Sequence, residues 1–163
     1  MLSLIVEPGY TIPSMGEEAV KAPVLAADEL TRLLAAEFPQ AWSVGNGLAI
    51  EAAWHGGCRL RQGFREQSLR PGATISGATI MALGDYAVYV ALLASLGWLP
   101  LAVTTNLNIN FLRKPRRADL VAECRLLKIG RRLVVGEVTI RSDGEDDLVA
   151  HLTSTYSVPP RAD

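Results

Sequence analysis

The spacing of hydrophobic and polar positions changes several times along the chain, and each change predicts an element. Over residues 28–38 (DELTRLLAAEF), apolar residues recur every three or four positions, which predicts an amphipathic helix that Pro39 ends. Two apolar runs follow, Leu48–Trp54 and Cys58–Phe64, with His55-Gly56-Gly57 between them. Short β-rich runs joined by a glycine turn predict a β-hairpin.

The longest apolar segment runs from Ser76 to Leu96 and is hydrophobic nearly all round, which is typical of a buried helix. Ser76 suits the N-cap position, and Gly97 suits the position past the end. From Tyr86 to Val103 no charged residue occurs, and this length is about that of a membrane span. Gly97 and Pro100 divide the segment, however, so we interpret it as a buried helix followed by a strand.

After Pro100 the period becomes two, which predicts a strand over LAVTTNLNINFL. On this alternation Thr104 and Asn106 share one face, and Leu107 and Phe111 share the other. Three more strands are predicted over Leu120–Ile129, Leu133–Arg141 and Leu148–Val158. Because the connections are short, neighbouring strands should be antiparallel. The pattern therefore predicts an α+β domain in which about five or six antiparallel strands cover one long helix.

Length and composition narrow the class of protein. The chain has 163 residues, which predicts one domain over residues 26–163 behind an irregular arm over residues 1–25. A net charge of −1 argues against a nucleic-acid partner. The N-terminus lacks the basic start of a signal peptide, so we expect a cytoplasmic protein that does not enter the membrane.

The cysteines and histidines give no sign of a metal site. The chain has two of each, and they form no CxxC motif or Cys/His cluster. Cys58 and Cys124 both lie in strand-like apolar runs. A disulfide between them is one possibility, and two reduced core cysteines are the interpretation we favour.

Asp85 is the one charged residue in the predicted central helix. It lies too far past the cap to complement the helix dipole, which acts within the first turn. Burial of an ionised carboxylate without partners is costly, so two explanations remain. Asp85 either forms a structural ion pair with a distant arginine, or it acts as a general base or nucleophile.

The start of the same helix offers a second chemical group. Gly77 and the small Ala78 leave backbone N–H groups open to a carbonyl oxygen, and a helix N-terminus carries partial positive charge. Gly77 and Asp85 are eight residues apart, about 12 Å along one helix. If both act on one carbonyl, they should come from two protomers arranged antiparallel across a symmetric interface.

Half of the 16 Lys and Arg residues lie between Arg113 and Arg132. Each of them alone is typical of a solvated turn. As a group they predict a phosphate site, because a guanidinium donates two parallel hydrogen bonds to phosphate.

The segments RPGATISGATIMALGDYAVYVALL, AVTTNLNINFLRKP, LKIGRRLVVGEVTI and VAHLTSTYSV, in this order, cover much of residues 45–158. In sequence and spacing they resemble the hotdog-fold acyl-CoA thioesterases of the phenylacetate-pathway (PaaI-like) kind. The resemblance implies a hotdog fold, a homodimer that often pairs into a tetramer, and hydrolysis of an acyl-coenzyme A thioester. Coenzyme A is part of the substrate, and no further cofactor is implied.

The resemblance also implies roles for residues. Asp85 corresponds to the acid that activates water or attacks the thioester, and Gly77 of the other protomer to the N–H that polarises the carbonyl. Thr104 corresponds to a hydroxyl that orients the water, and Ser76 begins the helix beside Gly77. Further candidates contact the acyl group or the coenzyme A phosphates: Arg70, Ala78, Met81, Tyr86, Tyr89, Asn106, Arg113, Arg116, Arg131 and Arg132.

Two positions depart from that family's pattern. Its usual His-Gly-Gly at the start of the helix is Ser76-Gly77-Ala78 here, and an asparagine six residues upstream of that histidine is Arg70. These departures keep open a non-catalytic acyl-CoA or lipid-binding domain. A hotdog hydratase or dehydratase is a further alternative, although His55 and His151 lie outside the start of the helix.

Overall fold

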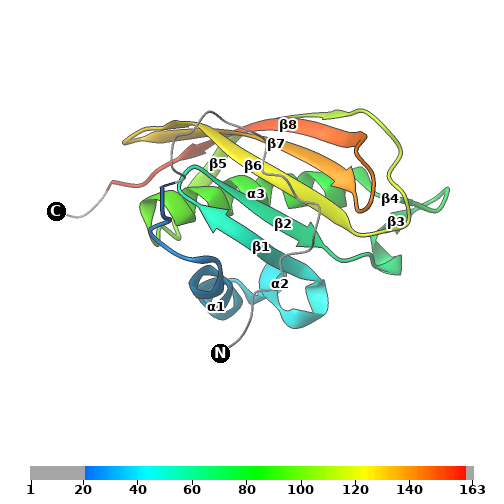
Figure 1. The fold of residues 1–163 in the computed structure, drawn as a ribbon, viewed down its shortest axis with the longest axis horizontal. Coiled ribbons are helices and arrows are strands. Elements are labelled where there is room, and N and C mark those ends of the chain that lie inside the picture. Colours follow the sequence, from blue (N-terminus) through cyan, green and yellow to red (C-terminus); the bar gives the residue numbers. More distant parts are fainter. Residues whose placement is uncertain (1–20, 161–163) are drawn as a thin grey trace.

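The computed structural model describes residues 21–160, which form one helix-and-sheet domain (Figure 1). The helices are α1 (Ala27–Glu37), α2 (Pro39–Trp42) and α3 (Gly77–Leu96). The strands are β1 (Leu48–Trp54), β2 (Gly57–Gln62), β3 (Leu69–Arg70), β4 (Thr74–Ile75), β5 (Val103–Phe111), β6 (Leu120–Ile129), β7 (Leu133–Ser142) and β8 (Leu148–Ser157).

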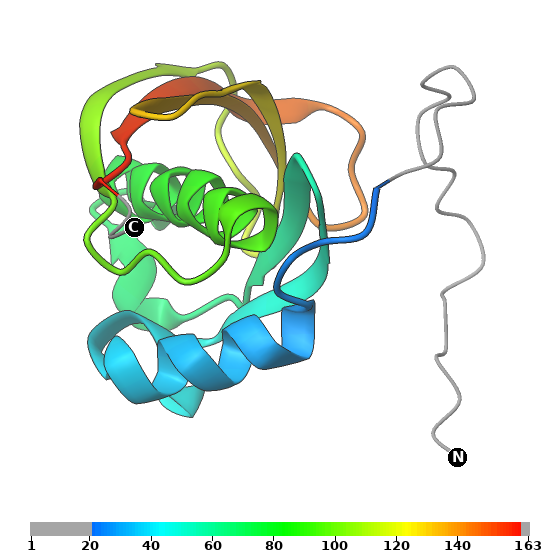
Figure 2. The same ribbon diagram turned by 90° about the vertical axis from the view of Figure 1, so that its left-hand side faces the viewer.

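Six of the strands form one antiparallel sheet in the order β1-β2-β6-β7-β8-β5. The sheet curves over α3, and α1 lies on the other side of that helix (Figure 2). This arrangement is the hotdog fold, with α3 as the enclosed helix. The predicted fold class is confirmed, including the six-stranded sheet and the single long helix.

The sequence signals at the two ends of α3 are also confirmed. Ser76 is the N-cap, and its Oγ accepts a hydrogen bond from the Thr79 N–H at 3.2 Å. Gly97 ends the helix with a φ of 92°, a conformation that disfavours other residues. By length and composition this helix could cross a membrane, but 67% of its most apolar 18-residue stretch is buried inside the fold. It is therefore the core helix of this domain.

The core lies between α3 and the concave face of the sheet, with α1 closing one side. Leu30 and Leu34 of α1 are fully buried in it. Cys58 and Cys124 are free, buried and paired across β2 and β6, so the interpretation as reduced core cysteines is confirmed. Burial and the neighbouring Cys58 raise the pKa of the Cys124 thiol, which keeps it protonated.

The alternation predicted for the strand after Pro100 is wrong at one point. The pairing of β5 with β8 shifts between Thr104 and Asn106, so Thr105 is an extra residue. Such a bulge breaks the period of two. As a result Thr104 faces α3 and lines the same cavity as Leu107 and Phe111, instead of sharing a face with Asn106.

Three short elements were not predicted from the sequence. The two-residue strands β3 and β4 and the one-turn helix α2 are too short to give a periodic signal, and the sequence analysis missed them. Within the predicted arm, only residues 21–25 belong to the described part of the chain. Lys21 and Val24 are bonded through their backbones to His55 and Ala94, so this piece lies against the domain.

Candidate active site

Asp85 lies halfway along α3, where two hydroxyl groups hold one of its carboxylate oxygens. Thr104 of β5 donates to Oδ1 at 2.8 Å, and Tyr156 of β8 donates to the same oxygen at 2.9 Å. The Tyr156 hydroxyl also lies 3.2 Å from the backbone oxygen of Asp85. Within residues 21–160, no hydrogen bond reaches Oδ2 and no ion pair involves Asp85. The described residues therefore form no structural ion pair with Asp85, and its Oδ2 is free to react.

Three tyrosines surround this carboxylate, and each remains a neutral hydroxyl. Burial and then the charge of Asp85 raise the pKa of Tyr156 far above its ordinary value. The same two causes raise the pKa of Tyr86, and burial raises the pKa of Tyr89. Because Tyr156 keeps its proton, it acts as a fixed donor toward the Asp85 side chain.

Gly77 is the first residue of α3, and helix geometry leaves its N–H without an intrahelical partner. In the part of the chain that the structure describes, no hydrogen bond from this N–H is present. A side chain here would meet the ring of Phe111 at about 3.1 Å, so glycine keeps the helix close to β5. Gly77 and Asp85 line one cavity of about 570 Å³ along the exposed side of α3, the helix-face cavity.

Comparison with known proteins places this geometry in a family. The sequence profile of the thioesterase superfamily matches residues 72–149 of this chain. A provisionally named esterase of Saccharolobus solfataricus is 30% identical over 138 residues, which is 83% of this chain and 87% of the relative. The chain belongs to the thioesterase superfamily.

Solved structures agree with this assignment. A provisionally named thioesterase from Silicibacter sp. TM1040 is 42% identical, with a TM-score of 0.77 over 85% of this chain and 94% of that one. A mutant of the phenylacetic acid degradation protein PaaI from Thermus thermophilus is 23% identical, with a TM-score of 0.64. It covers 74% of this chain and 99% of its own, and it supports the shared fold.

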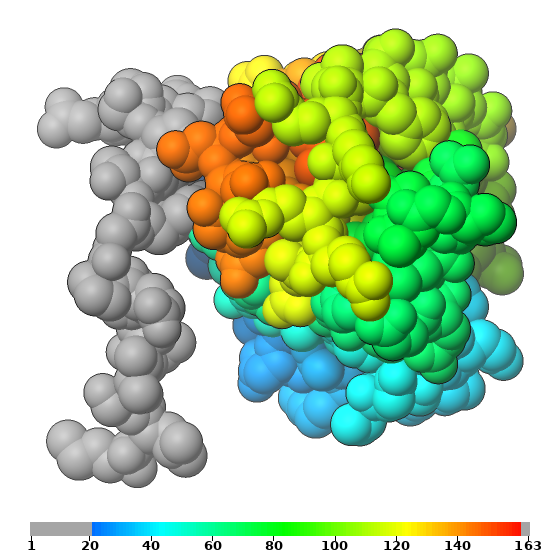
Figure 3. Space-filling model, turned by 90° about the vertical axis from the view of Figure 1, so that its right-hand side faces the viewer, coloured from blue at the N-terminus to red at the C-terminus, as the bar shows by residue number. Residues whose placement is uncertain are grey.

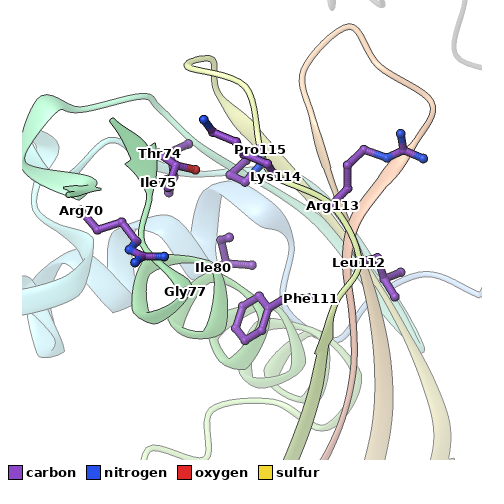
Figure 4. Close-up of a pocket in the computed structure, with 10 residues that line it drawn as sticks. All are labelled: Arg70, Thr74, Ile75, Gly77, Ile80, Phe111, Leu112, Arg113, Lys114 and Pro115. Atoms are coloured by element: carbon purple, nitrogen blue, oxygen red, sulfur yellow. The ribbon is translucent and has the colours of Figure 1, made fainter. Parts of the chain in front are cut away.

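In this superfamily member the start of α3 adjoins a cavity of about 650 Å³ with a cationic rim, the basic cavity. It is lined by Arg70, Arg113 and Lys114 together with Gly77 and Phe111. Figure 4 shows the Arg70 guanidinium directed toward the start of α3, whereas Arg113 points away from it. Arg113 forms an ion pair with Asp147 at 3.1 Å; among the described residues, Arg70 and Lys114 have no acidic partner.

The surface at this end is formed by segments distant in sequence. Figure 3 shows the connection from β5 to β6 running between the β7–β8 turn (orange) and the segment that includes β3 and β4 (green). This connection carries Arg116, whose guanidinium pairs with Glu145 at 3.2 Å. Arg116 does not line the basic cavity.

The predicted group of cations does not form one cluster within a single chain. Arg131 and Arg132 lie in the β6–β7 turn, next to Leu133, which pairs with Ser157; Ser157 also pairs with Val103 at the start of β5. Arg113 follows the other end of β5, about 25–30 Å away along the sheet. These residues are close together in the sequence, but β6 lies between them and carries the chain from one end of the sheet to the other. Their predicted role in phosphate binding stays a prediction.

The remaining candidates fall on two sides of Asp85. Ala78 and Met81 line the helix-face cavity, and Met81 is 40% exposed. Tyr86 and Tyr89 line a separate cavity of about 410 Å³ between α1, α3 and the α3–β5 connection, the aromatic cavity. Asn106 lies on the exposed edge strand and lines neither.

The sequence analysis missed several residues of the aromatic cavity. Tyr156 comes from the last strand, Phe38 and Glu37 from the end of α1, and Trp98 from the α3–β5 connection. Alternation along β8 does place Tyr156 on the buried face, which was the available signal. Nothing in the sequence brings the end of α1 next to Asp85, because that contact depends on how α1 packs under α3.

Proposed function

We propose that this thioesterase-superfamily protein hydrolyses acyl thioesters of coenzyme A to the free acid and coenzyme A. One observation carries the proposal: Asp85 is fixed through Oδ1 by Thr104 and Tyr156 and keeps Oδ2 free. A positioned carboxylate of this kind can take a proton from water or attack a carbonyl carbon. The superfamily membership supports thioester hydrolysis.

The three cavities adjoin in an order that fits the parts of such a substrate. Gly77 and Phe111 line both the basic cavity and the helix-face cavity. Asp85 and Thr104 line both the helix-face cavity and the aromatic cavity. In our proposal phosphate groups bind near Arg70 and the acyl group enters the aromatic cavity. The thioester then lies beside Asp85.

The chemical step needs no further cofactor in this proposal. A water oxygen attacks the thioester carbon while Asp85 accepts the water proton, and the carbon–sulfur bond then breaks. The thiolate of coenzyme A leaves and takes up that proton. Alternatively Asp85 attacks first and water hydrolyses the resulting anhydride, which gives the same products. In both cases a backbone N–H stabilises the developing oxyanion.

We propose that Gly77 of a second protomer supplies this N–H. Within one chain Gly77 is about 12 Å along the helix from Asp85, too far to polarise the same carbonyl. A twofold axis near Met81 would bring Gly77 of each protomer beside Asp85 of the other. Two features support this arrangement: Ala78 and Met81 are exposed on α3, and β5 is an edge strand of the sheet.

The edge strand β5 has features that suit pairing with a strand of a second protomer. Val103 and Phe111, at the two ends of β5, are 57% and 51% exposed. An exposed edge with apolar side chains is a ready template for another strand. Antiparallel pairing centred on Leu107 would place each Val103 opposite the partner's Phe111, so we propose a homodimer as the minimal active unit. Its pairing into a homotetramer stays a prediction.

The test is release of free coenzyme A from a panel of acyl-CoA thioesters by the wild type and by Asp85→Asn. The substitution keeps the shape of the side chain and removes the base, so we expect kcat to fall about 10²–10⁴-fold. Equal rates for the two proteins would contradict the assignment of Asp85. Tight coenzyme A binding without turnover by the wild type would instead identify a non-catalytic binding domain.

A further inference from the structure

The aromatic cavity has a charge pattern that the proposed hydrolysis does not explain. Its lining includes two carboxylates, Asp85 on α3 and Glu37 at the end of α1, and Glu37 is exposed to solvent. Among residues 21–160, no Lys, Arg or His lines it. An acyl chain that passes Asp85 into this cavity therefore meets a second carboxylate and no cation.

Much of the lining is aromatic, and the rings pack against one another. Tyr86 meets Phe38 edge to face at a centroid distance of 6.1 Å, and Tyr89 stacks on Tyr156 at 6.0 Å. Within residues 21–160 the Tyr86 and Tyr89 hydroxyls make no hydrogen bond. The cavity thus offers apolar rings, two neutral hydroxyl groups and the carboxylate of Glu37 as an acceptor.

This combination discriminates by charge. A carboxylate at the far end of an acyl group would find no cationic partner among these residues, and the charge of Glu37 would repel it. Two neutral hydroxyl donors do not cancel that repulsion, because like charges brought together oppose binding. A methyl end loses nothing there, and a hydroxyl end can donate to Glu37.

We propose that Glu37 is a specificity-determining residue that admits acyl groups with an uncharged end and rejects those that end in a carboxylate. The inference rests on the proposed function, since it assigns the aromatic cavity to the acyl group. Glu37 lies outside residues 72–149, the segment that the superfamily model matches. The proposed selection therefore depends on a residue outside that segment.

The experiment compares three coenzyme A thioesters of equal chain length: hexanoyl, 6-hydroxyhexanoyl and adipoyl. For the wild type we expect kcat/KM for adipoyl-CoA to be at least about tenfold below that for the other two. In Glu37→Arg the ratio of adipoyl to hexanoyl kcat/KM should rise at least about tenfold, with Glu37→Gln in between. The arginine suits this position, because a cation near a helix C-terminus is favourable.

Asp28→Arg is the matched control, since it makes the same charge change on the exposed surface of the same helix without lining the cavity. The ratios of kcat/KM among the three thioesters should equal those of the wild type. Equal rates of the wild type on adipoyl-CoA and hexanoyl-CoA would overturn the inference, as would a Glu37→Arg ratio that matches the control. In either case the proposed function would stand. Failure of the wild type to hydrolyse any acyl-CoA would overturn both.

Discussion

At the scale of single residues, the site depends on how Asp85 is held as much as on its presence. Tyr156 is 4% exposed, and its hydroxyl reaches both a side-chain and a backbone oxygen of Asp85. Hydrogen bonds to a charged group contribute about 1.5–3 kcal/mol, which is enough to fix a rotamer. Tyr156 is therefore a positioning residue for the proposed base.

Tyr156→Phe tests this role, because it removes the hydroxyl and keeps the ring that stacks on Tyr89. We expect kcat for acyl-CoA hydrolysis to fall about tenfold, with KM little changed. Tyr89→Phe is the control, because it removes a hydroxyl that makes no hydrogen bond within residues 21–160 and leaves both donors to Asp85 in place. It should lower kcat less than Tyr156→Phe does. Equal kcat for the two variants would show that Tyr156 serves packing alone.

At the scale of elements, two local features bring the strands to α3. The bulge at Thr105 turns Thr104 toward the helix, where a regular strand would have turned it away. Gly84, next to Asp85, lets the helix approach β8 so closely that an added methyl would overlap Cδ2 of Leu152. This close approach is what allows Tyr156 on the same strand to reach Asp85.

Gly84→Ala should therefore lower both stability and activity. Overpacking of a rigid core costs about 1–3 kcal/mol, so we expect a decrease of that size in the free energy of unfolding, measured by denaturant titration. The shift of α3 away from β8 should also lower kcat. Gly45→Ala is the matched control, because an added methyl there meets nothing within 4 Å. Equal stability of the two variants would contradict the close approach of α3 to β8.

At the scale of the whole molecule, the proposed site is shared between protomers. Gly77→Pro tests the role of this N–H, because proline has no backbone N–H. The helix should still form, since proline is tolerated at the first helical position and Ser76 has the extended ψ of 147° that a residue before proline needs. Gly77→Ala is the control, since it makes a similar contact with Phe111 and keeps the N–H. We expect Gly77→Pro to lose about 10²-fold in kcat and Gly77→Ala to retain most activity.

Mixed dimers provide the decisive measurement for the shared site. Gly77→Pro and Asp85→Asn chains, coexpressed with two different affinity tags and purified through both, should regain about half of the wild-type activity. One of the two sites then combines an intact Asp85 with an intact Gly77 of the partner. Activity that stays at the level of the single variants would place both groups in one chain, and a monomeric active protein would exclude the shared site.

The sequence by itself determined the elements and the choice of Asp85. Local periodicity, Ser76 and Gly97 set the bounds of α3, because caps and apolar stripes act over a few residues. One carboxylate in an apolar helix identified the candidate base for a physical reason, the cost of burying an unpaired charge. The small strands β3 and β4 lacked enough residues for any such signal.

Only the tertiary structure decided what meets Asp85. Tyr156 lies 71 residues away in sequence and Glu37 on another helix, and their positions depend on strand order and on the packing of α1. The two groups of cations that are neighbours in sequence lie at opposite ends of the sheet, because β6 lies between them and runs the length of the sheet. Periodicity reports which way a side chain faces within its own element, and contacts between elements are set by how whole surfaces pack.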